Sequence, residues 1–446
     1  MKVIIVGCTH SGTAATKTMI KNDTNIQVSI YEKNDNVSFL SCGIALYIGG
    51  VVKDKKGLFY SNAEELSAMG AQVFLKHEVV NIDLDKKEVL VKNLNTQEKF
   101  IDSFDKLVMS TGSWPVIPKL EGINSKNLLL SKNFEHANNI IAYAKKIKKI
   151  TVIGAGYIGI ELAEAFSKQG KEVTLVDIEK RIMPKYLDQE FTNVVEEAFR
   201  KNNVRLALGQ KVINFKFQND LITHVQTDQE IFETEMVIMC ISFVPNTQLL
   251  RDKLETSAND AFIVNEFLQT SHPDVYACGD CTNIYYNPTK NYKYIPLATN
   301  AVRMGTIIGL NIIGKKPKKY LGTQGTSGIK IYDFSISSTG LTEYAAQLLG
   351  IDFDSVVIKD ANRPEFMPKF ESALLKIVYE KDSQRILGGQ ILSTADLTEK
   401  MNTLSVCIQK GMTMEELAFI DFFFHPYFNK PWNLLNLAGL KALDKQ

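Results

Sequence analysis

A glycine-rich turn between a buried strand and a helix occurs twice in this chain, and this repeat constrains the fold more than any other feature. In the first copy an apolar strand over 2–6 runs into GCTHSG, a helix is predicted over 13–21, and a second strand over 27–31 ends at Glu32. A strand–helix–strand unit with an acidic residue about twenty positions after its last glycine is the pattern of a dinucleotide-binding Rossmann turn.

The second copy has the same parts in the same order. A strand over 149–153 is followed by GAGYIG, a helix is predicted over 160–169, and the next strand ends at Asp177. Glycines let backbone N–H groups approach a pyrophosphate, and the helix N-terminus adds partial positive charge. The first copy departs from the pattern because Thr9 replaces the middle glycine, although its small side chain still allows that approach. Two such units predict two bound dinucleotides.

Composition excludes several other classes of protein. A length of 446 residues predicts two or three domains, and a formal net charge of +1 gives no attraction for nucleic acid or an anionic membrane. No apolar stretch approaches the roughly 20 residues of a membrane span. The six cysteines are scattered without a disulfide framework or metal-ligand spacing. We therefore expect a cytoplasmic protein without a metal site.

Three further motifs identify a family. They are LVMSTGSWP (107–115), HPDVYACGDC (272–281) and PLATNAVRMG (296–305). With the two glycine-rich turns, they make the sequence similar over its full length to the two-dinucleotide flavoprotein disulfide reductases, and within them to the pyridine nucleotide oxidase and peroxidase branch. The resemblance implies an α/β fold with two Rossmann-like dinucleotide-binding domains, the first for FAD and the second for NADH, plus a C-terminal α+β dimerisation domain.

The resemblance also implies domain boundaries and binding residues. The FAD domain would be split over 1–112 and 246–321, the NADH domain would take 113–245, and the dimerisation domain 322–446. The residues implied for FAD are Gly7, Thr9, Gly12, Glu32, Thr111, Gly112, Asp280, Leu297 and Ala298. Those implied for NADH are Gly154, Gly156, Tyr157, Ile158, Gly159, Glu161 and Asp177. Asp177 would bond the adenosine ribose and repel a 2′-phosphate, which implies a preference for NADH over NADPH. The nearby Lys180 and Arg181 would weaken this preference.

The C-terminal part reads as antiparallel strands followed by helices. Its aromatic segment FIDFFFHPYFNKPW should not stay exposed, and the resemblance makes it part of a homodimer or dimer-of-dimers interface. His425 in this segment is interpreted as an interface residue or as one that reaches the partner's thiol.

Cys42 is the candidate redox residue. Glutathione-type reductases carry C-x4-C beside the flavin, but Tyr47 stands at the second position here, so no internal disulfide can form there. A single thiol must cycle through sulfenic acid or through a mixed disulfide with a small thiol such as coenzyme A. We expect the N-terminus of a helix from about residue 43 to favour the thiolate. His10 matches the histidine that this branch places beside the cysteine, where it would orient or protonate oxygen species.

Cys278 and Cys281 form a C-x-x-C, but Asp280 between them belongs to the flavin motif. We therefore interpret both cysteines as packing residues.

The function implied by the resemblance is that of a water-forming NADH oxidase, in which two NADH reduce O2 through FAD and a Cys42 thiolate/sulfenic acid cycle. NADH peroxidase and coenzyme A disulfide reductase remain alternatives. SCGIALY lacks the proline that coenzyme A reductases tend to show after the cysteine. A non-enzymatic flavoprotein that senses redox state through Cys42 is a more distant alternative.

Overall fold

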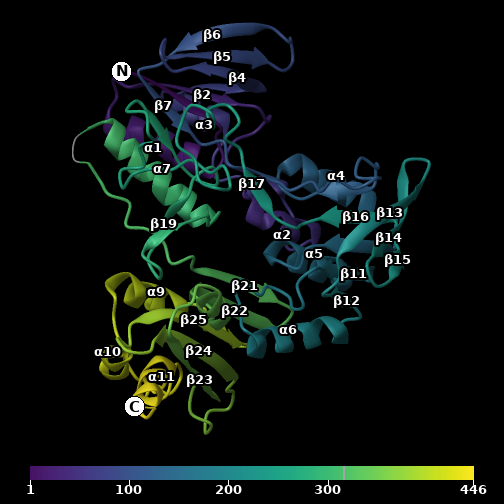
Figure 1. Cartoon of the computed structure of the whole chain (residues 1–446), viewed down its shortest axis with the longest axis vertical. Coiled ribbons are helices and arrows are strands. Elements are labelled where there is room, and N and C mark those ends of the chain that lie inside the picture. Colours follow the sequence, from purple (N-terminus) through teal and green to yellow (C-terminus); the bar gives the residue numbers. More distant parts are fainter. Residues whose placement is uncertain (315–316, 446) are drawn as a thin grey trace.

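The computed structural model describes residues 1–314 and 317–445, which form three lobes (Figure 1). The N-terminal lobe is built on a parallel sheet that brings together strands from both ends of the first three hundred residues. Its order is β18 (Val275–Ala277), β7 (Lys106–Met109), β1 (Lys2–Val6), β2 (Gln27–Glu32) and β3 (Gln72–Leu75). Helices α1 (His10–Asn22) and α7 (Ala298–Ile312) pack against each other beside it.

The middle lobe repeats this architecture. Its parallel sheet has the order β12 (Arg205–Leu208), β11 (Glu172–Asp177), β10 (Lys149–Ile153), β16 (Met236–Met239) and β9 (Leu128–Leu130). The helices of this lobe are α4 (Phe134–Ala144), α5 (Tyr157–Lys168) and α6 (Gln189–Lys201). The central strands are almost wholly buried, as expected for parallel strands covered on both faces. Strands β8 (Ser113–Pro115) and β17 (Phe243–Pro245) pair where the chain passes between the two lobes.

Each Rossmann-like lobe also carries a three-stranded antiparallel sheet that the sequence analysis did not predict. One is β4 (His77–Asp83), β5 (Glu88–Asn93) and β6 (Lys99–Ser103); the other is β13 (Val212–Gln218), β14 (Leu221–Thr227) and β15 (Ile231–Glu233). Shorter elements of the N-terminal lobe are α3 (Ala63–Ala68), β19 (Ile284–Tyr286) and β20 (Asn291–Lys293).

The C-terminal lobe confirms the predicted antiparallel sheet with helices. Its order is β21 (Ser327–Ile331), β22 (Phe334–Gly340), β25 (Ile386–Ser393), β24 (Ser372–Glu380) and β23 (Phe353–Ala361). The helices are α8 (Glu343–Leu348), α9 (Lys400–Lys410), α10 (Met414–Phe419) and α11 (Leu434–Leu443). Together the three lobes confirm the predicted α/β class with an added α+β domain. None of the helices in the described residues has the length and apolar character needed to cross a membrane.

Two predicted helix starts were too late by one turn, because α1 begins at His10 and α5 at Tyr157. The glycine-rich segments were taken as turns over their whole length, but the last glycine of each already belongs to the helix. A Cβ on Gly12 would lie 2.3 Å from the Gly7 carbonyl oxygen, and one on Gly159 would lie 1.8 Å from that of Gly154. These glycines are required because the helix packs directly on the end of its strand.

Candidate active site

The acidic residues that end the second strand of each repeat accept equivalent backbone hydrogen bonds from the glycine-rich turns. Glu32 accepts a hydrogen bond from the N–H of Cys8 at 2.7 Å, and Asp177 accepts one from the N–H of Ala155. Each carboxylate also accepts from the backbone N–H two residues further along, at 2.9 and 2.8 Å. The sequence repeat is therefore a structural repeat at the level of single hydrogen bonds.

The N-termini of the helices at these turns have no side-chain cap. Thr9, Gly156 and Leu297 are the N-cap residues of α1, α5 and α7, and none of them caps its helix with a side-chain hydrogen bond. Helices α6 and α9 also lack such a cap, whereas α3, α4, α8, α10 and α11 have one. Uncapped N–H groups with a helix dipole behind them suit an anionic group such as a pyrophosphate.

The glycines predicted to face a ligand have open space before them. A Cβ built on Gly156 or on Gly112 would meet no atom within 4 Å. Thr111, beside Gly112, instead bonds the chain itself, because its hydroxyl donates to the carbonyl of Asn246 at 2.5 Å. Gly156 of the second turn and Gly112 after β7 therefore leave room for a ligand.

Cys42 lies where the N-terminal and middle lobes meet. It sits in a 3₁₀ turn (Ser41–Gly43) before the short helix α2 (Ile44–Ile48), whose apolar residues pack into the core of the middle lobe. Figure 1 shows α2 lying beside α4 and α5, far from the rest of its own stretch of sequence. Cys42 is the exposed one of the six cysteines, and none of the six forms a disulfide.

We expected the N-terminus of the following helix to favour the Cys42 thiolate, and this expectation was wrong, because the groups of the chain around the sulfur favour the thiol. Burial around the sulfur raises the thiol pKa, and the carboxylates of Glu161 and then Asp280 raise it further. Lys132 opposes them by lowering it. The helix that follows has only five residues and starts after the cysteine, so its dipole is too small to reverse these effects.

Lys132 is a site residue that sequence reasoning missed. Its ammonium group donates to the hydroxyl of Ser113 at 2.9 Å and lies 3.2 Å from the carboxylate of Asp280, which also accepts from Ser113 at 2.8 Å. Lys132 follows β9 of the middle lobe, so this cluster joins the two lobes beside Cys42. No motif in its sequence neighbourhood signals it.

His10, the first residue of α1, belongs to the same neighbourhood. Burial lowers its pKa; the charge of Asp280 raises the pKa and that of Lys132 lowers it. Because Asp280 and Lys132 also act on Cys42, the structure brings His10 and Cys42 together around one charged pair.

Tyr157 and Glu161 face this region from α5. The Tyr157 hydroxyl shares a 2.7 Å hydrogen bond with Ser327 of the C-terminal lobe, and its ring packs on Tyr186 with centroids 4.5 Å apart. Burial, followed by the charge of Glu164, raises the pKa of Glu161 to about 7. Glu161 is therefore poised between its charged and neutral forms near neutral pH. Ile158 is the second residue of the same helix.

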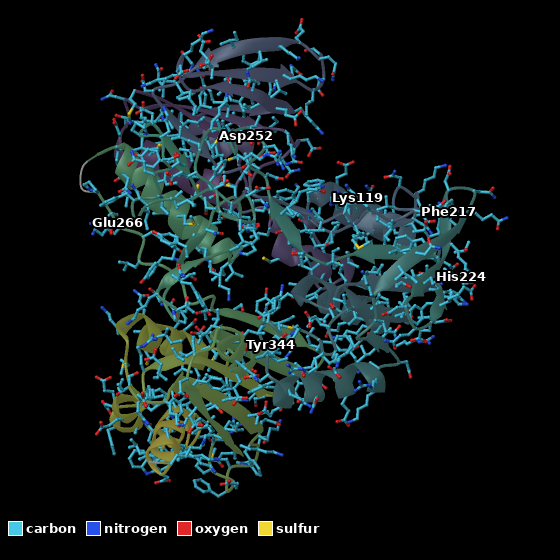
Figure 2. The ribbon with its side chains drawn as sticks, in the orientation of Figure 1. Lys119, Phe217, His224, Asp252, Glu266 and Tyr344 are labelled. Atoms are coloured by element: carbon cyan, nitrogen blue, oxygen red, sulfur yellow. The ribbon has the colours of Figure 1, made fainter. Side chains whose placement is uncertain are left out.

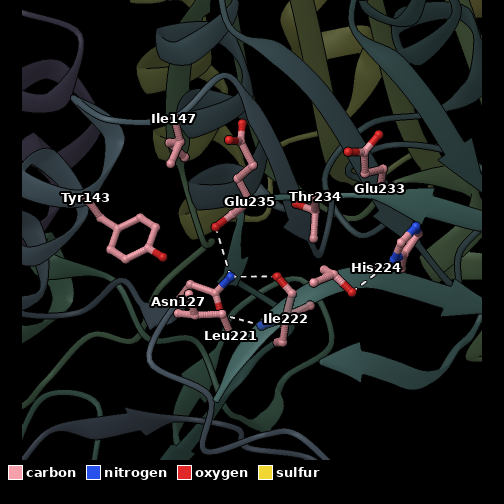
Figure 3. Close-up of a pocket in the computed structure, with 10 residues that line it drawn as sticks. Asn127, Tyr143, Ile147, Leu221, Ile222, His224, Glu233, Thr234 and Glu235 are labelled. Carbon is pink, nitrogen blue, oxygen red and sulfur yellow. Dashed lines mark hydrogen bonds between the residues drawn. The ribbon is translucent and has the colours of Figure 1, made fainter. Parts of the chain in front are cut away.

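Two other groups of residues lie outside the site. Cys278 and Cys281 are buried and unbonded, and burial raises the pKa of Cys281 to about 11, in accord with a packing role. A shallow pocket of about 310 Å³ is lined by Asn127 and His224, among others (Figure 3), at the outer edge of the middle lobe where Figure 2 labels His224. The side-chain amide of Asn127 and Nδ1 of His224 already bond the chain. No group of three or more potential metal ligands occurs in residues 1–314 and 317–445.

Comparison with known proteins gives consistent matches over the whole chain. Residues 1–305 match the family described as pyridine nucleotide-disulphide oxidoreductase, and residues 326–434 match its dimerisation domain. An NADH oxidase from Enterococcus faecalis is 52% identical over 445 residues, covering 100% of both chains.

Solved structures agree. The water-forming NADH oxidase from Lactobacillus brevis bound to NADH superposes with a TM-score of 0.97 at 48% identity, covering 100% of this chain and 98% of the other. An engineered water-forming NADPH oxidase made from it, bound to NADPH, has a TM-score of 0.98 at 47% identity and covers 100% and 99% of the two chains.

Proposed function

Because the chain belongs to the pyridine nucleotide-disulphide oxidoreductase family, we propose that it is an FAD-dependent NADH oxidase that reduces O2 to water. The observation that carries this proposal is the single free thiol of Cys42, held between two dinucleotide-type turns with no second cysteine beside it. The 52% identity to an NADH oxidase and the likeness to a water-forming one support it. The same comparisons do not favour a peroxidase or a coenzyme A reductase.

The first glycine-rich turn binds the cofactor FAD, and the second binds the substrate NADH. Gly7, Thr9, Gly12 and Glu32 hold FAD with Thr111, Gly112, Asp280, Leu297 and Ala298, over domain residues 1–112 and 246–321. Gly154, Gly156, Ile158, Gly159 and Asp177 hold NADH over residues 113–245, with Tyr157 and Glu161 beside the nicotinamide. FAD held by these residues would supply the hydride acceptor for NADH and the electron donor for O2.

The residues of the chain complete the reduction. Cys42 supplies the second pair of electrons: its thiolate attacks peroxide, the O–O bond breaks, one oxygen bonds to sulfur as Cys–SOH, and the other leaves as water after taking a proton. A second NADH then supplies the electrons that return Cys–SOH to the thiol and release the second water. Lys132 favours this chemistry because its charge lowers the pKa of the Cys42 thiol.

Asp177 sets the preference for NADH over NADPH. It lies at the end of β11, where an adenosine ribose meets a Rossmann turn, and a 2′-phosphate would meet its negative charge. The engineered NADPH oxidase supports this role, since D177A is among its five substitutions and residue 177 is aspartate in this chain.

The assembly is a homodimer formed through residues 322–446. The exposed aromatic side chains of 419–432 support this, as does the match to a dimerisation domain. His425 is exposed within that segment and stacks on Tyr427, so we assign it to the interface. The free state of all six cysteines fits a reducing, cytoplasmic setting.

A stoichiometry tests the function. Purified enzyme is supplied with NADH in air, and NADH oxidation, O2 consumption and free H2O2 are followed together. Two NADH per O2 without free peroxide is the expected result. One NADH per O2 with matching peroxide excludes water formation, and turnover only with added H2O2 identifies a peroxidase instead. Turnover only with added coenzyme A disulfide identifies the reductase.

A further inference from the structure

Tyr60 contacts the site without belonging to any of its motifs. Its hydroxyl oxygen lies 3.1 Å from the carbonyl oxygen of Thr9 and 3.3 Å from Nδ1 of His10. The two rings stack with centroids 5.8 Å apart and planes within 6° of parallel. Tyr60 therefore touches both the backbone before His10 and the imidazole itself.

The single proton of the Tyr60 hydroxyl can satisfy these contacts in only one way. The Thr9 carbonyl can only accept, so the phenol proton must point at it. The Tyr60 oxygen is then left as an acceptor, and the contact with His10 is a hydrogen bond only if Nδ1 carries a hydrogen. The opposite arrangement would set two oxygen acceptors against each other at 3.1 Å.

We propose that Tyr60 is a positioning residue that fixes the His10 imidazole in its Nδ1-protonated tautomer, leaving Nε2 as a proton acceptor for the Cys42 thiol. The inference rests on the proposed function for the identity of the reaction. His10 Nε2 is buried and has no hydrogen-bond partner among the described residues, as expected for an atom kept for a reacting group.

The surroundings of His10 keep it neutral, which this role requires. The imidazole opens helix α1, whose N-terminus repels a cation. The charged groups that act on it are Asp280, which favours the cation, and Lys132, which opposes it, while burial also disfavours the charge. A neutral ring protonated on Nδ1 accepts at Nε2 and cannot donate there.

The proton balance of the cysteine step then closes within the chain. Nε2 takes the proton of the Cys42 S–H, the thiolate attacks H2O2, and the O–O bond breaks. One oxygen bonds to sulfur, which is oxidised by two electrons, and the other leaves as hydroxide and takes the proton back from Nε2 as water. The sum is Cys–SH + H2O2 → Cys–SOH + H2O. His10 therefore acts first as a base and then as the proton donor to the leaving oxygen, and this second step is the protonation of an oxygen species that the resemblance implied.

The test uses the holoenzyme with ¹⁵N-labelled histidine and its Tyr60→Phe variant. In wild type the ¹⁵N spectrum should place the His10 proton on Nδ1. Loss of one neutral hydrogen bond in Y60F should lower the ratio of Nδ1-H to Nε2-H about two- to tenfold. The share of consumed O2 that appears as H2O2 should at least double. Thr13 also donates to the Thr9 carbonyl, so removing the phenol leaves no unpaired acceptor and preserves the fold.

Tyr344→Phe is the matched control, because Tyr344 is 37% exposed against 40% for Tyr60 and lies in the C-terminal lobe (Figure 2). This variant should leave the His10 spectrum and the peroxide share unchanged. A wild-type proton on Nε2 overturns the proposal, and so does an unchanged tautomer ratio or peroxide share in Y60F. Failure of the proposed function can be distinguished from failure of this proposal. It would change the wild-type NADH:O2 stoichiometry and leave the wild-type tautomer of His10 as it is.

Discussion

Cys42 is the one residue whose replacement separates the two halves of the proposed reaction. The dinucleotide turns do not depend on its sulfur, so Cys42→Ser should still consume NADH in air. Without a thiol to supply the second pair of electrons to peroxide, O2 reduction should stop at H2O2, and the NADH:O2 ratio should fall from two to one. NADH, O2 and peroxide assays measure this.

Cys407→Ser provides the control for the Cys42 variant. Cys407 is buried in α9 of the C-terminal lobe, so its substitution should leave the ratio at two. If Cys42→Ser still makes only water, the sulfenic acid cycle is wrong.

The protonation state of Glu161 should change the pKa of the Cys42 thiol, so the reactivity of this thiol should depend on the titration of Glu161. Its carboxylate raises the thiol pKa, and its own pKa is raised to about 7. Glu161→Gln should therefore lower the thiol pKa and speed alkylation of Cys42 by iodoacetamide severalfold at pH 8. Below about pH 6 most Glu161 is protonated and already neutral, so the wild-type and variant rates should converge there.

Alkylation rates at several pH values, with Cys42 identified by mass spectrometry, check this prediction. Glu172→Gln, an exposed change at the start of β11, should behave as wild type throughout. Equal rates for wild type and Glu161→Gln at pH 8 would show that this carboxylate does not act on the thiol.

Local sequence patterns predicted those helices and strands that are determined by residues close together in the sequence. The strand–turn–helix repeat predicted β1, β2, β10 and β11 because apolar runs and glycines act within a few residues. The first turns of α1 and α5 were missed because Gly12 and Gly159 serve the contact between helix and strand and do not form part of the turn.

Features that depend on contacts between distant segments could not be predicted. Helix α2 packs on α5, more than a hundred residues away, and this contact places Cys42 near Glu161. Lys132 reaches Asp280 across 148 positions of sequence, and Tyr60 reaches His10 across 50. Neither Lys132 nor Tyr60 stands in a motif, so their contacts with Asp280 and His10 can be seen only in the folded chain.

The contact between α6 and the C-terminal sheet depends on one buried cation. Lys376 on β24 is fully buried and lies 3.5, 2.9 and 2.6 Å from the carboxylates of Asp188, Glu190 and Glu343. Lys376→Met should keep the packing of the methylene chain but leave the carboxylates without their cation. Because Glu190 and Glu343 are 42% and 34% exposed and only Asp188 is buried, we expect a loss at or below the lower end of the roughly 3–5 kcal/mol for a broken buried pair. We expect a clear fall in the midpoint of thermal unfolding, measured by calorimetry.

Lys330→Met is the control for this substitution, since Lys330 is an exposed lysine on β21 of the same sheet. Its unfolding midpoint should match that of wild type. An unchanged midpoint for Lys376→Met would mean that the buried lysine does not hold the two lobes together.

The whole molecule places the reaction where its lobes meet. Cys42 directly precedes helix α2, which packs into the middle lobe, His10 belongs to the N-terminal lobe, and Lys132 bonds Asp280 across the two. The C-terminal lobe holds the middle lobe through Tyr157 and Ser327. The geometry of the site therefore depends on how the three lobes pack. A substitution at any contact between the lobes should change the activity.

The C-terminal lobe also presents a surface that a single chain leaves uncovered. Phe423 and Phe428 are 70% and 64% exposed, and their rings contact each other. The other exposed aromatic residues of segment 419–432 are Phe419, Phe424, Tyr427 and Trp432. Contiguous apolar surface of this kind marks an interface, and its burial between two copies supplies the main favourable free energy of association.

The double substitution of Phe423 and Phe428 by aspartate should therefore convert the proposed dimer to monomer, because two buried charges per subunit would have no partner in the interface. Sedimentation velocity at micromolar protein measures the change, with circular dichroism to show that the variant is folded. Leu348→Asp introduces a charge at a side chain that is also 70% exposed but lies in α8, outside the segment, and should leave the dimer intact. A double variant that still sediments as a dimer would place the interface elsewhere on the molecule.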